Sequence, residues 1–388
     1  MIEIKNLDVI FGDKPEAALA LLDQGGDREQ ILEKTGQVLG VKNASLKVER
    51  GEICVLMGLS GSGKSSLLRC VNGLNPISRG EVNIEYQGQM INFATAEAET
   101  QRELRMKTIS MVFQKFALMP WLTVAENVAM PLEIQGLSKQ EIQSRVKDQL
   151  EIVGLSDWAD HKPGQLSGGM QQRVGLARAL ATESDILLMD EPFSALDPLI
   201  RSQLQDELLQ LQAKLNKTIL FVSHDLDEAL KIGNHIAIMK DGEIVQHSNP
   251  QDIVMNPAND YVRDFVAHTN PMNVLLAKDL MKPLSELEQC ENGLRLSKRH
   301  DYWLSTDKQA TIYRDQRCEL QRWSAEQEIA SLKNAGTIVA ANTPMRDVLE
   351  IRYDTDHSVF IEENNKIVGF IGDKELYHSL LGKMLIND

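Results

Sequence analysis

The stretch at residues 58–65, GLSGSGKS, decides how the rest of the chain is interpreted. It fits the pattern G-x-x-x-x-G-K-[S/T] without a mismatch. An apolar run of strand length, 53–57, comes before it, and residues 67–71 have the pattern of the first turns of a helix. Because a strand, a loop and a helix in this order are the setting of a phosphate-binding loop, we expect that function rather than an ordinary glycine-rich turn.

Each residue type in this stretch suits a polyphosphate. The glycines let consecutive backbone N–H groups converge on one anion, Lys64 can reach the terminal phosphates, and Ser65 can ligate Mg2+. We therefore expect a nucleoside triphosphate, with contacts from the loop and the first turn of the helix: Gly58, Ser60, Gly61, Ser62, Gly63, Lys64, Ser65 and Ser66.

Length and charge set limits on the class of protein. A chain of 388 residues, 43% of them hydrophobic, is long enough for two or three domains with their own cores. The chain has 41 Lys and Arg and 56 Asp and Glu, so its net charge is −15. This negative charge opposes binding to nucleic acid or anionic lipid outside a local basic patch.

The cysteines and the apolar runs indicate a cytoplasmic protein. None of the four cysteines is in C-x-x-C spacing, and Cys54 and Cys70 fall in the strand and helix beside the loop, so we interpret them as small core residues. Residues 1–5 lack a signal pattern, and no apolar run approaches the ~18 residues that span a bilayer. Work at a membrane would require docking onto another subunit.

The segments before the loop mix strand and helix patterns. Apolar and polar residues alternate with period two over residues 2–7, which predicts an antiparallel strand with one solvent-exposed face. Residues 17–22 are helix-like, and Asp27 with Gln30 predicts a capping box for a second short helix that stops at Gly36. Helices of this kind most often pack on a core edge, so the sequence assigns no chemistry to this insert.

A helical region follows the short apolar strand 109–113, which ends at Gln114. Pro120, Pro131 and Pro163 punctuate its helix-like segments, and Ser138 with Glu141 predicts another capping box, with a helix stop at Gly154. The pattern predicts a helical subdomain inserted into a nucleotide-binding sheet.

Strands of a parallel sheet resume after this region. Residues 186–189 and 218–222 are continuous apolar runs, as expected for strands buried on both faces. Between them, Asp197-Pro198 starts a helix that extends to about Leu215, and Asp241-Gly242 predicts a hairpin.

The remaining residues lack any phosphate-loop feature and are numerous enough for a separate domain. They show a helix pattern at 344–350, a strand at 358–361 with a partner at 366–371, and a closing helix at 374–381.

Two adjacent carboxylates, Asp190 and Glu191, follow the strand 186–189. Beside a polyphosphate, such a pair suits Mg2+ coordination by Asp190 and activation of water by Glu191, although in isolation it is more often a solvated turn. His224 follows the strand 218–222, and a lone histidine there is more often structural than catalytic; Gln114 has the same ambiguity.

Ser167, Gly168 and Gly169 open a helix that extends to about Ala181. Exposed amides and a positive helix end make a second anion site, and an ordinary N-cap role for Ser167 is compatible with it.

Together these motifs closely resemble the ATP-binding subunits of ABC transporters. The matching segments, in family order over residues 1–267, are Walker A at 58–65, the Q-loop at Gln114, the LSGG signature at 166–169, Walker B at Asp190 with the catalytic Glu191, the D-loop at 194–197 and the switch His224. The resemblance implies an α/β P-loop NTPase with a helical subdomain at about 115–182.

The resemblance also implies a mechanism. Two copies would form a head-to-tail homodimer in which Ser167, Gly168 and Gly169 of one copy close on ATP held by Lys64 of the other. Glu191 would then orient water and His224 would hold the γ-phosphate side. The further contacts implied are Phe11 on adenine, Mg2+ at Ser65, Gln114 and Asp190, and nucleotide contacts from Gln172 and Asp197.

Within this family the chain resembles the importers of glycine betaine, proline and choline, through residues 11–42, 57–65, 116–120 and 193–201. Residues 268–275, HTNPMNVL, favour the choline member. The implied partners are membrane permease subunits and, indirectly, a solute-binding protein, with the chain on the cytoplasmic face of the inner membrane and no nucleic acid bound. Trp121, Trp158, Trp303 and Trp323 show no grouping typical of an aromatic cage, so the solute should bind in a partner.

The tail, 268–388, is similar to the paired CBS domains that regulate such importers, with the second repeat at about 336–386 and the first, within 277–333, degenerate or absent. The implied fold is a smaller α+β regulatory domain. Arg295, Lys298, Arg299 and His300 form a basic cluster that favours a solvated surface over anionic lipid. The competing hypothesis is a soluble ABC-type ATPase that acts on DNA or ribosomes; the acidic charge, the single ATPase unit and the lack of a long heptad arm weigh against it.

Overall fold

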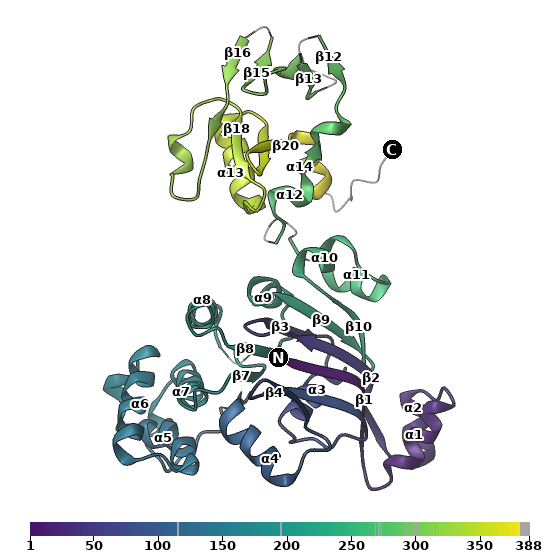
Figure 1. Cartoon of the computed structure of the whole chain (residues 1–388), viewed down its shortest axis with the longest axis vertical. Helices are drawn as coiled ribbons and strands as arrows, with labels where there is room; N and C mark the ends of the chain where they lie inside the picture. The colour runs from purple at the N-terminus through teal and green to yellow at the C-terminus, as the bar shows by residue number, and fades with distance from the viewer. Residues whose placement is uncertain are drawn as a thin grey trace. The chain divides into compact units, whose positions relative to one another are not determined.

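The chain divides into two compact units, Met1–Ile253 with Pro257–Asp264, and Val254–Asn256 with the residues from Phe265 on (Figure 1). The computed structural model describes residues 1–380 except Lys115, Ala195, His268, Pro271, Asn273, Asn292, 298–300 and Asp315. Three residues of the segment that favoured choline, and three of the basic cluster, therefore lie outside the described residues.

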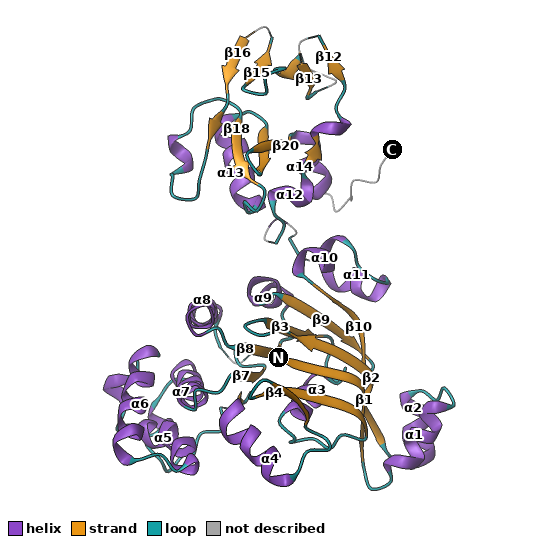
Figure 2. Ribbon diagram, viewed as in Figure 1, coloured by secondary structure: helices purple, strands orange, loops and turns teal. Residues whose placement is uncertain are grey.

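A six-stranded sheet with the order β10-β9-β3-β8-β7-β6 forms the centre of the first unit (Figure 2). All five residues of β3, β7 and β8 are buried, as their continuous apolar runs predict. These three strands are parallel to their neighbours, and only the β9–β10 hairpin at Asp241-Gly242 is antiparallel. The strands are β3 (Ile53–Met57), β6 (Ile109–Val112), β7 (Ile186–Asp190), β8 (Thr218–Val222), β9 (His235–Lys240) and β10 (Glu243–Ser248).

A second, antiparallel sheet has the order β2-β1-β4-β5. Its strands are β1 (Ile2–Phe11), β2 (Val38–Val48), β4 (Arg79–Tyr86) and β5 (Gln89–Asn92). The predicted first strand is confirmed, and it is longer than its alternating pattern. One core cluster takes side chains from both sheets and from α3 (Lys64–Val71), so this helix is fixed between the sheets.

The insert between β1 and β2 folds into two helices, α1 (Pro15–Asp23) and α2 (Arg28–Thr35). The predicted capping box is present at Asp27, and Gly36 ends α2 with a left-handed φ of 67°. The insert has its own small core of Ile10, Ala18, Leu22, Ile31 and Leu39. Because this core includes β1 and β2 residues, the insert is packed onto the second sheet.

Three helices, α5 (Val124–Gln135), α6 (Lys139–Ile152) and α7 (Gly168–Ala181), form the helical subdomain around a separate apolar core. It lies on the opposite side of the sheets from the insert (Figure 1). The Ser138 capping box is confirmed. Pro131 was wrongly interpreted as a break, because α5 continues through it. The burial of Val128 and Leu132 on either side of it retains the helix despite one lost backbone hydrogen bond.

The other helices of this unit cover the sheets or connect them. The Asp197-Pro198 start is confirmed at α8. These helices are α4 (Ala98–Glu103), the π-helical turn Leu104–Thr108, α8 (Pro198–Leu215), α9 (Leu226–Ile232), α10 (Pro250–Met255) and α11 (Asp260–Val266), of which the last residues of α10 and α11 belong to the second unit.

The second unit contains two five-stranded sheets, with the orders β11-β20-β19-β18-β17 and β12-β13-β14-β15-β16. Residues 337–380 run strand, helix, strand, strand, helix around one apolar core, which fits a CBS-like motif and confirms the predicted elements there: β18 (Thr337–Ala340), α13 (Met345–Thr355), β19 (Val359–Glu363), β20 (Lys366–Ile371) and α14 (Asp373–Leu380).

Residues 289–319 do not repeat this order, because they form an antiparallel meander of very short strands. The elements before β18 are α12 (Ala277–Leu280), β11 (Lys282–Pro283), β12 (Gln289–Cys290), β13 (Gly293–Arg295), β14 (Tyr302–Leu304), β15 (Ala310–Tyr313), β16 (Gln316–Glu319) and β17 (Gln321–Arg322). In the part of the chain that the structure describes, no helix has the length and apolar character needed to cross a membrane.

Candidate functional site

Four strands of the central sheet end at one edge and present polar residues there. The neighbours β3, β8, β7 and β6 are parallel, so their carboxyl ends meet. The phosphate loop follows β3, His224 follows β8, Asp190 and Glu191 end β7, and Gln114 follows β6. Ligands of open α/β sheets bind at this edge. Residues separated by more than 160 positions in the sequence are thus brought into one site.

The phosphate loop is a tight cradle that leaves no room for a Cβ at two glycines. Gly58 has a φ of 143°, and a Cβ there would lie 2.2 Å from the Met239 carbonyl oxygen. Gly63 has a φ of 103°, and its Cβ would lie 2.4 Å from the Gly40 carbonyl oxygen. The Ser62 side-chain oxygen is buried without a hydrogen-bond partner among the described residues. A polar atom buried in such a cradle fits a phosphate-binding loop.

Lys64 begins α3 and folds back over the loop. Its Nζ donates to the carbonyl oxygens of Gly58 at 2.8 Å and Leu59 at 3.1 Å. Burial lowers the pKa of the Lys64 ammonium, and the carboxylates of Glu191 and Asp190 oppose that shift. An ammonium with three donors on a flexible stem can exchange carbonyl oxygens for phosphate oxygens.

Asp190 is almost fully buried and is bonded on both carboxylate oxygens. Ser65 Oγ donates to Oδ1 at 2.7 Å, and an Arg69 guanidinium nitrogen donates to Oδ2 at 2.8 Å. Ser65 and Arg69 are four residues apart on one face of α3. Sequence reasoning missed Arg69, although this i, i+4 spacing from Ser65 was a signal that could have found it.

The residues predicted for Mg2+ divide into two groups. Ser65 and Asp190 lie together, whereas the Gln114 amide donates to Glu191 Oε2 at 3.0 Å. No cluster of three His, Cys, Asp or Glu side chains able to hold a metal occurs among the described residues. A single carboxylate with a hydroxyl suits Mg2+, because this ion takes its other ligands from phosphates and water. The donor set therefore fits a nucleotide-bound Mg2+.

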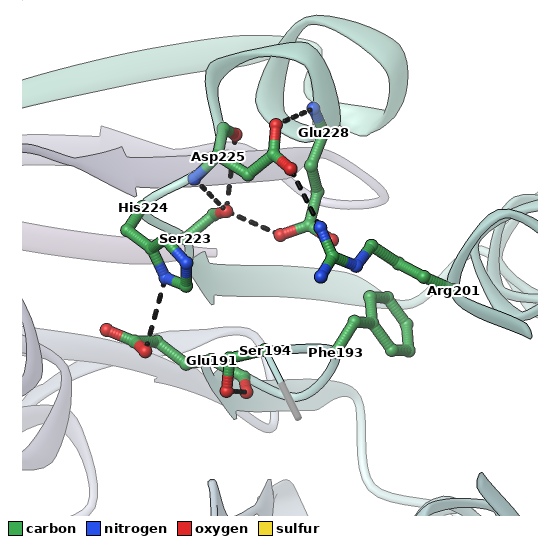
Figure 3. Close-up of a pocket in the computed structure, with 8 residues that line it drawn as sticks. All are labelled: Glu191, Phe193, Ser194, Arg201, Ser223, His224, Asp225 and Glu228. Atoms are coloured by element: carbon green, nitrogen blue, oxygen red, sulfur yellow. Dashed lines mark hydrogen bonds and ion pairs between the residues drawn. The ribbon is translucent and has the colours of Figure 1, made fainter. Parts of the chain in front are cut away.

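Glu191 stands between two loops. Its Oε2 accepts from Gln114 and lies 3.3 Å from His224 Nδ1. Its backbone has a left-handed φ of 45°, and its N–H donates to the Val222 carbonyl oxygen at 3.1 Å. Figure 3 shows the carboxylate and the imidazole facing each other, with a dashed line for this contact. The geometry places a carboxylate where the ends of three strands meet.

Behind His224, a buried polar network supports the loop (Figure 3). Ser223 Oγ donates to one Glu228 carboxylate oxygen, and the Gln205 amide of α8 donates to the other at 2.9 Å. Burial raises the pKa of Glu228. The Arg201 guanidinium of α8 pairs with Asp225 at 2.9 Å. No motif or spacing indicates these pairs, which join residues that are 5 to 24 positions apart across a strand end and two helices.

The signature segment is exposed at the start of α7. Ser167 Oγ accepts from the Met170 N–H at 3.3 Å, so the N-cap interpretation is confirmed. Ser167 and Gly168 are exposed, and Gly169 is half-buried. Gln172 differs, since its side chain is 2% exposed and both of its polar atoms lack partners among the described residues. A surface contact of Gln172 with a nucleotide is therefore not supported by its position in one copy.

Two further predicted contacts come from other elements of this unit, Asp197 from the start of α8 and Phe11 from the end of β1. Asp197 is exposed and caps α8 by accepting from the Ile200 N–H at 3.1 Å. Its neighbour Ala195 lies outside the described residues. The half-buried Phe11 ring covers Gly40, where a Cβ would lie 2.5 Å from the ring, and the Gly40 carbonyl adjoins Gly63 of the loop. Phe11 thus lies beside the phosphate loop despite the insert that follows it in sequence.

Comparisons with known proteins agree with this geometry. A model of the ABC transporter family matches residues 41–194. The glycine betaine/proline betaine transport system ATP-binding protein of Escherichia coli K12 is 54% identical over 72% of this chain and 69% of its own length. The glycine betaine transport ATP-binding protein of Bacillus subtilis 168 is 42% identical over 98% of this chain and 92% of its own. The chain belongs to this family of ABC transporter ATP-binding proteins.

A solved structure supports the fold of this ABC ATPase. The dimeric post-hydrolysis structure of the ATP-binding cassette MJ0796, bound to ADP and Pi, is 32% identical, with a TM-score of 0.54 over 64% of this chain and 99% of that chain. The resemblance to the quaternary-amine importers is confirmed, and so is the α/β P-loop fold with its helical subdomain. The preference for the choline member stays a prediction.

Proposed function

We propose that this ABC ATPase binds ATP at the edge formed by β3, β8, β7 and β6 and that its hydrolysis energises the import of a quaternary amine of the betaine class. The convergence of Lys64, Asp190, Glu191 and His224 at this edge carries the proposal. Family membership assigns the chemistry, because an ABC-type cassette hydrolyses ATP.

The residues at this edge suit distinct steps of phosphoryl transfer. The loop amides and Lys64 bind the β- and γ-phosphates, and Phe11 stacks on adenine. Ser65 and Asp190 would hold Mg2+, with Gln114 as a further ligand. The bound ion would neutralise phosphate charge. Glu191 accepts the proton of the attacking water, and His224 holds the carboxylate and the γ-phosphate in register.

The second half of the site comes from a second copy. Ser167 and Gly168 are exposed at a helix start, and no hydrogen bond joins them to the phosphate loop within the described part of one chain. We propose a head-to-tail homodimer in which this segment and Asp197 of one copy close on the nucleotide of the other. The dimeric state of the similar cassette supports this arrangement.

We further propose that the dimer docks on permease subunits at the cytoplasmic face of the membrane, with a solute-binding protein delivering the solute. Proteins similar to this chain are named as transport ATP-binding proteins for glycine betaine, proline betaine, carnitine and trimethylamine N-oxide. These solutes share a methylated, cationic or dipolar nitrogen. Choline belongs to the same chemical class and is the narrower candidate. The second unit, by its CBS-like motif, would regulate transport.

Uptake measurements in a strain that lacks this chain test the proposal. We expect the strain with the chain restored to take up labelled glycine betaine or choline. Its uptake of labelled proline should be lower than its uptake of these two solutes. The solute that competes best for uptake identifies the substrate. Purified chain whose ATPase activity rises with DNA or ribosomes, but not with its permease, would contradict the transport function.

A further inference from the structure

The α1–α2 insert reaches the phosphate loop through one side chain, Arg28. A terminal guanidinium nitrogen of Arg28 donates to the Gly61 carbonyl oxygen at 2.7 Å, across 33 residues of sequence. Gly61 is exposed and has a φ of 81°, in the middle of the loop. Helix α2, to which no sequence motif assigns a function, therefore contacts the backbone of the phosphate loop.

The insert holds Arg28 firmly. Arg28 is the first residue of α2, directly after the Asp27 capping box, and Gly36 closes the other end of the helix. Ile31 is fully buried in the insert core, one turn from Arg28. Because this core includes Ile10 of β1 and Leu39 of β2, the backbone of Arg28 is held relative to the second sheet.

The contact continues through the loop to Lys64. The Gly61 carbonyl belongs to the same planar peptide as the Ser62 N–H. That N–H donates to the Leu59 carbonyl oxygen at 3.1 Å, and the same oxygen accepts from Lys64 Nζ at 3.1 Å. Arg28, one peptide and Lys64 thus form a chain of hydrogen bonds, and such chains polarise their members.

A second bond fixes the adjoining carbonyl. The Ser62 carbonyl oxygen accepts from the Gly242 N–H of the β9–β10 hairpin at 3.0 Å. Two successive carbonyls of the loop are therefore held from outside, by Arg28 and by Gly242. The Arg28 bond holds the Gly61–Ser62 peptide, whose N–H closes the turn onto the Leu59 carbonyl oxygen, and the Gly242 bond holds the Ser62–Gly63 peptide. These bonds therefore keep the loop in the shape in which its remaining N–H groups can surround an anion.

The charge of Arg28 adds to this effect. Among the ion pairs of the described residues, none pairs a carboxylate with Arg28. Its guanidinium is bound to the Gly61 carbonyl oxygen instead, and a cation beside the loop attracts a polyphosphate.

We propose that Arg28 is a positioning residue of the nucleotide site, which orients the Gly61–Ser62 peptide and raises affinity for nucleotides that carry a β-phosphate. This inference rests on the proposed binding of ATP. It gives the insert a role in nucleotide affinity. It also implies that α2 and the phosphate loop move as one piece.

Calorimetric titration of the full chain with MgATP and with MgADP tests the proposal. We expect Arg28→Ala to weaken both affinities by about tenfold, equivalent to about 1.4 kcal/mol. Arg28→Lys keeps a donor and the charge and should restore most of the affinity. Lys34→Ala removes an exposed cation from the last turn of the same helix and serves as the matched control, with affinities equal to wild type.

Kinetics separate positioning from a general loss of structure. We expect Arg28→Ala to raise the KM for ATP while kcat at saturating ATP stays near wild type, and to leave the thermal midpoint without nucleotide unchanged. If Arg28→Ala does not fold, Arg28→Gln is measured in its place. Nucleotide affinities of either variant equal to wild type would overturn the role of Arg28, whereas a wild-type chain that binds no MgATP would overturn the proposed function itself.

Discussion

At the scale of single residues, the proposed mechanism makes turnover depend on Glu191. Gln114 and His224 hold its carboxylate at 3.0 Å and 3.3 Å, in a position to accept a proton from water. We expect Glu191→Gln to bind ATP as the wild type does and to hydrolyse it about 100- to 10,000-fold more slowly, because the amide keeps the shape but cannot act as a base.

Phosphate release under single-turnover conditions measures this effect. Glu207→Gln is a suitable control because Glu207, a half-buried residue of α8, pairs with Arg173 and makes no contact with Glu191. Near-normal hydrolysis by Glu191→Gln would move the base to another group, with His224 examined first.

Glu228 should make the stability of the first unit depend on pH. Burial raises the pKa of this carboxyl above its ordinary value, so the folded chain binds more protons than the unfolded chain. The free energy of unfolding should therefore fall as pH rises from about 4.3 through the raised pKa, and this contribution is fully present only below that window.

Glu228→Gln removes this titration while it keeps a group that can bond Gln205 and Ser223. We expect the variant to gain stability relative to wild type on going from mildly acidic to mildly alkaline buffer, as measured by urea unfolding. A difference between the two proteins that does not change with pH would contradict the prediction.

Site residues could be predicted from sequence where a motif is local. Gly58 to Ser65, Asp190 with Glu191, and Ser167 each combine a short pattern with the end of a strand or the start of a helix. Arg28 on Gly61, and Gln205 on Glu228, are pairs between elements and leave no spacing to detect. Their geometry depends on packing that a single sequence does not express.

At the scale of elements, α7 is tied to the Q-loop by Arg178. Its guanidinium donates to the carbonyl oxygens of Phe116 at 2.8 Å and Ala117 at 2.6 Å, and both residues have a left-handed φ. We expect Arg178→Met to speed amide exchange in residues 114–119, because the loop loses the only two side-chain bonds recorded to these carbonyls among the described residues.

Hydrogen exchange followed by mass spectrometry gives the measurement. Arg145→Met is the control, because Arg145 contacts Ala181 and Glu183 rather than the Q-loop. The free energy of unfolding of Arg178→Met should change little. The cost of burying the Arg178 charge is about equal to the stabilisation from its two hydrogen bonds, and the substitution removes both. Unchanged exchange in this loop would show that Arg178 does not hold it.

Element boundaries were most predictable where capping residues mark them. Asp27, Ser138 and Asp197 begin helices as their patterns indicate. The meander of 289–319 could not be predicted, because its strands have two to four residues and too few alternations for a period. Pro131 shows the converse, a helix breaker that tertiary packing overrides.

At the scale of the whole molecule, the first unit should function without the second. Its main core cluster draws only on residues between Ile2 and Ile244. We expect a chain that ends at Ala267 to keep MgATP binding and hydrolysis close to the full chain while its transport loses any response to ionic strength. A truncated chain that fails to bind MgATP, or that responds as the full chain does, would contradict this division of roles.

Solute import by the whole transporter should depend on ATP hydrolysis at Glu191. This dependence is measured by the uptake of labelled glycine betaine into proteoliposomes that contain the permease, the solute-binding protein and this chain. ATP is supplied in the compartment where this chain is bound to the permease. We expect ATP-dependent accumulation with the wild type and none with Glu191→Gln. Accumulation that persists with Glu191→Gln, or that is absent with wild type for every quaternary amine of this class, would contradict it.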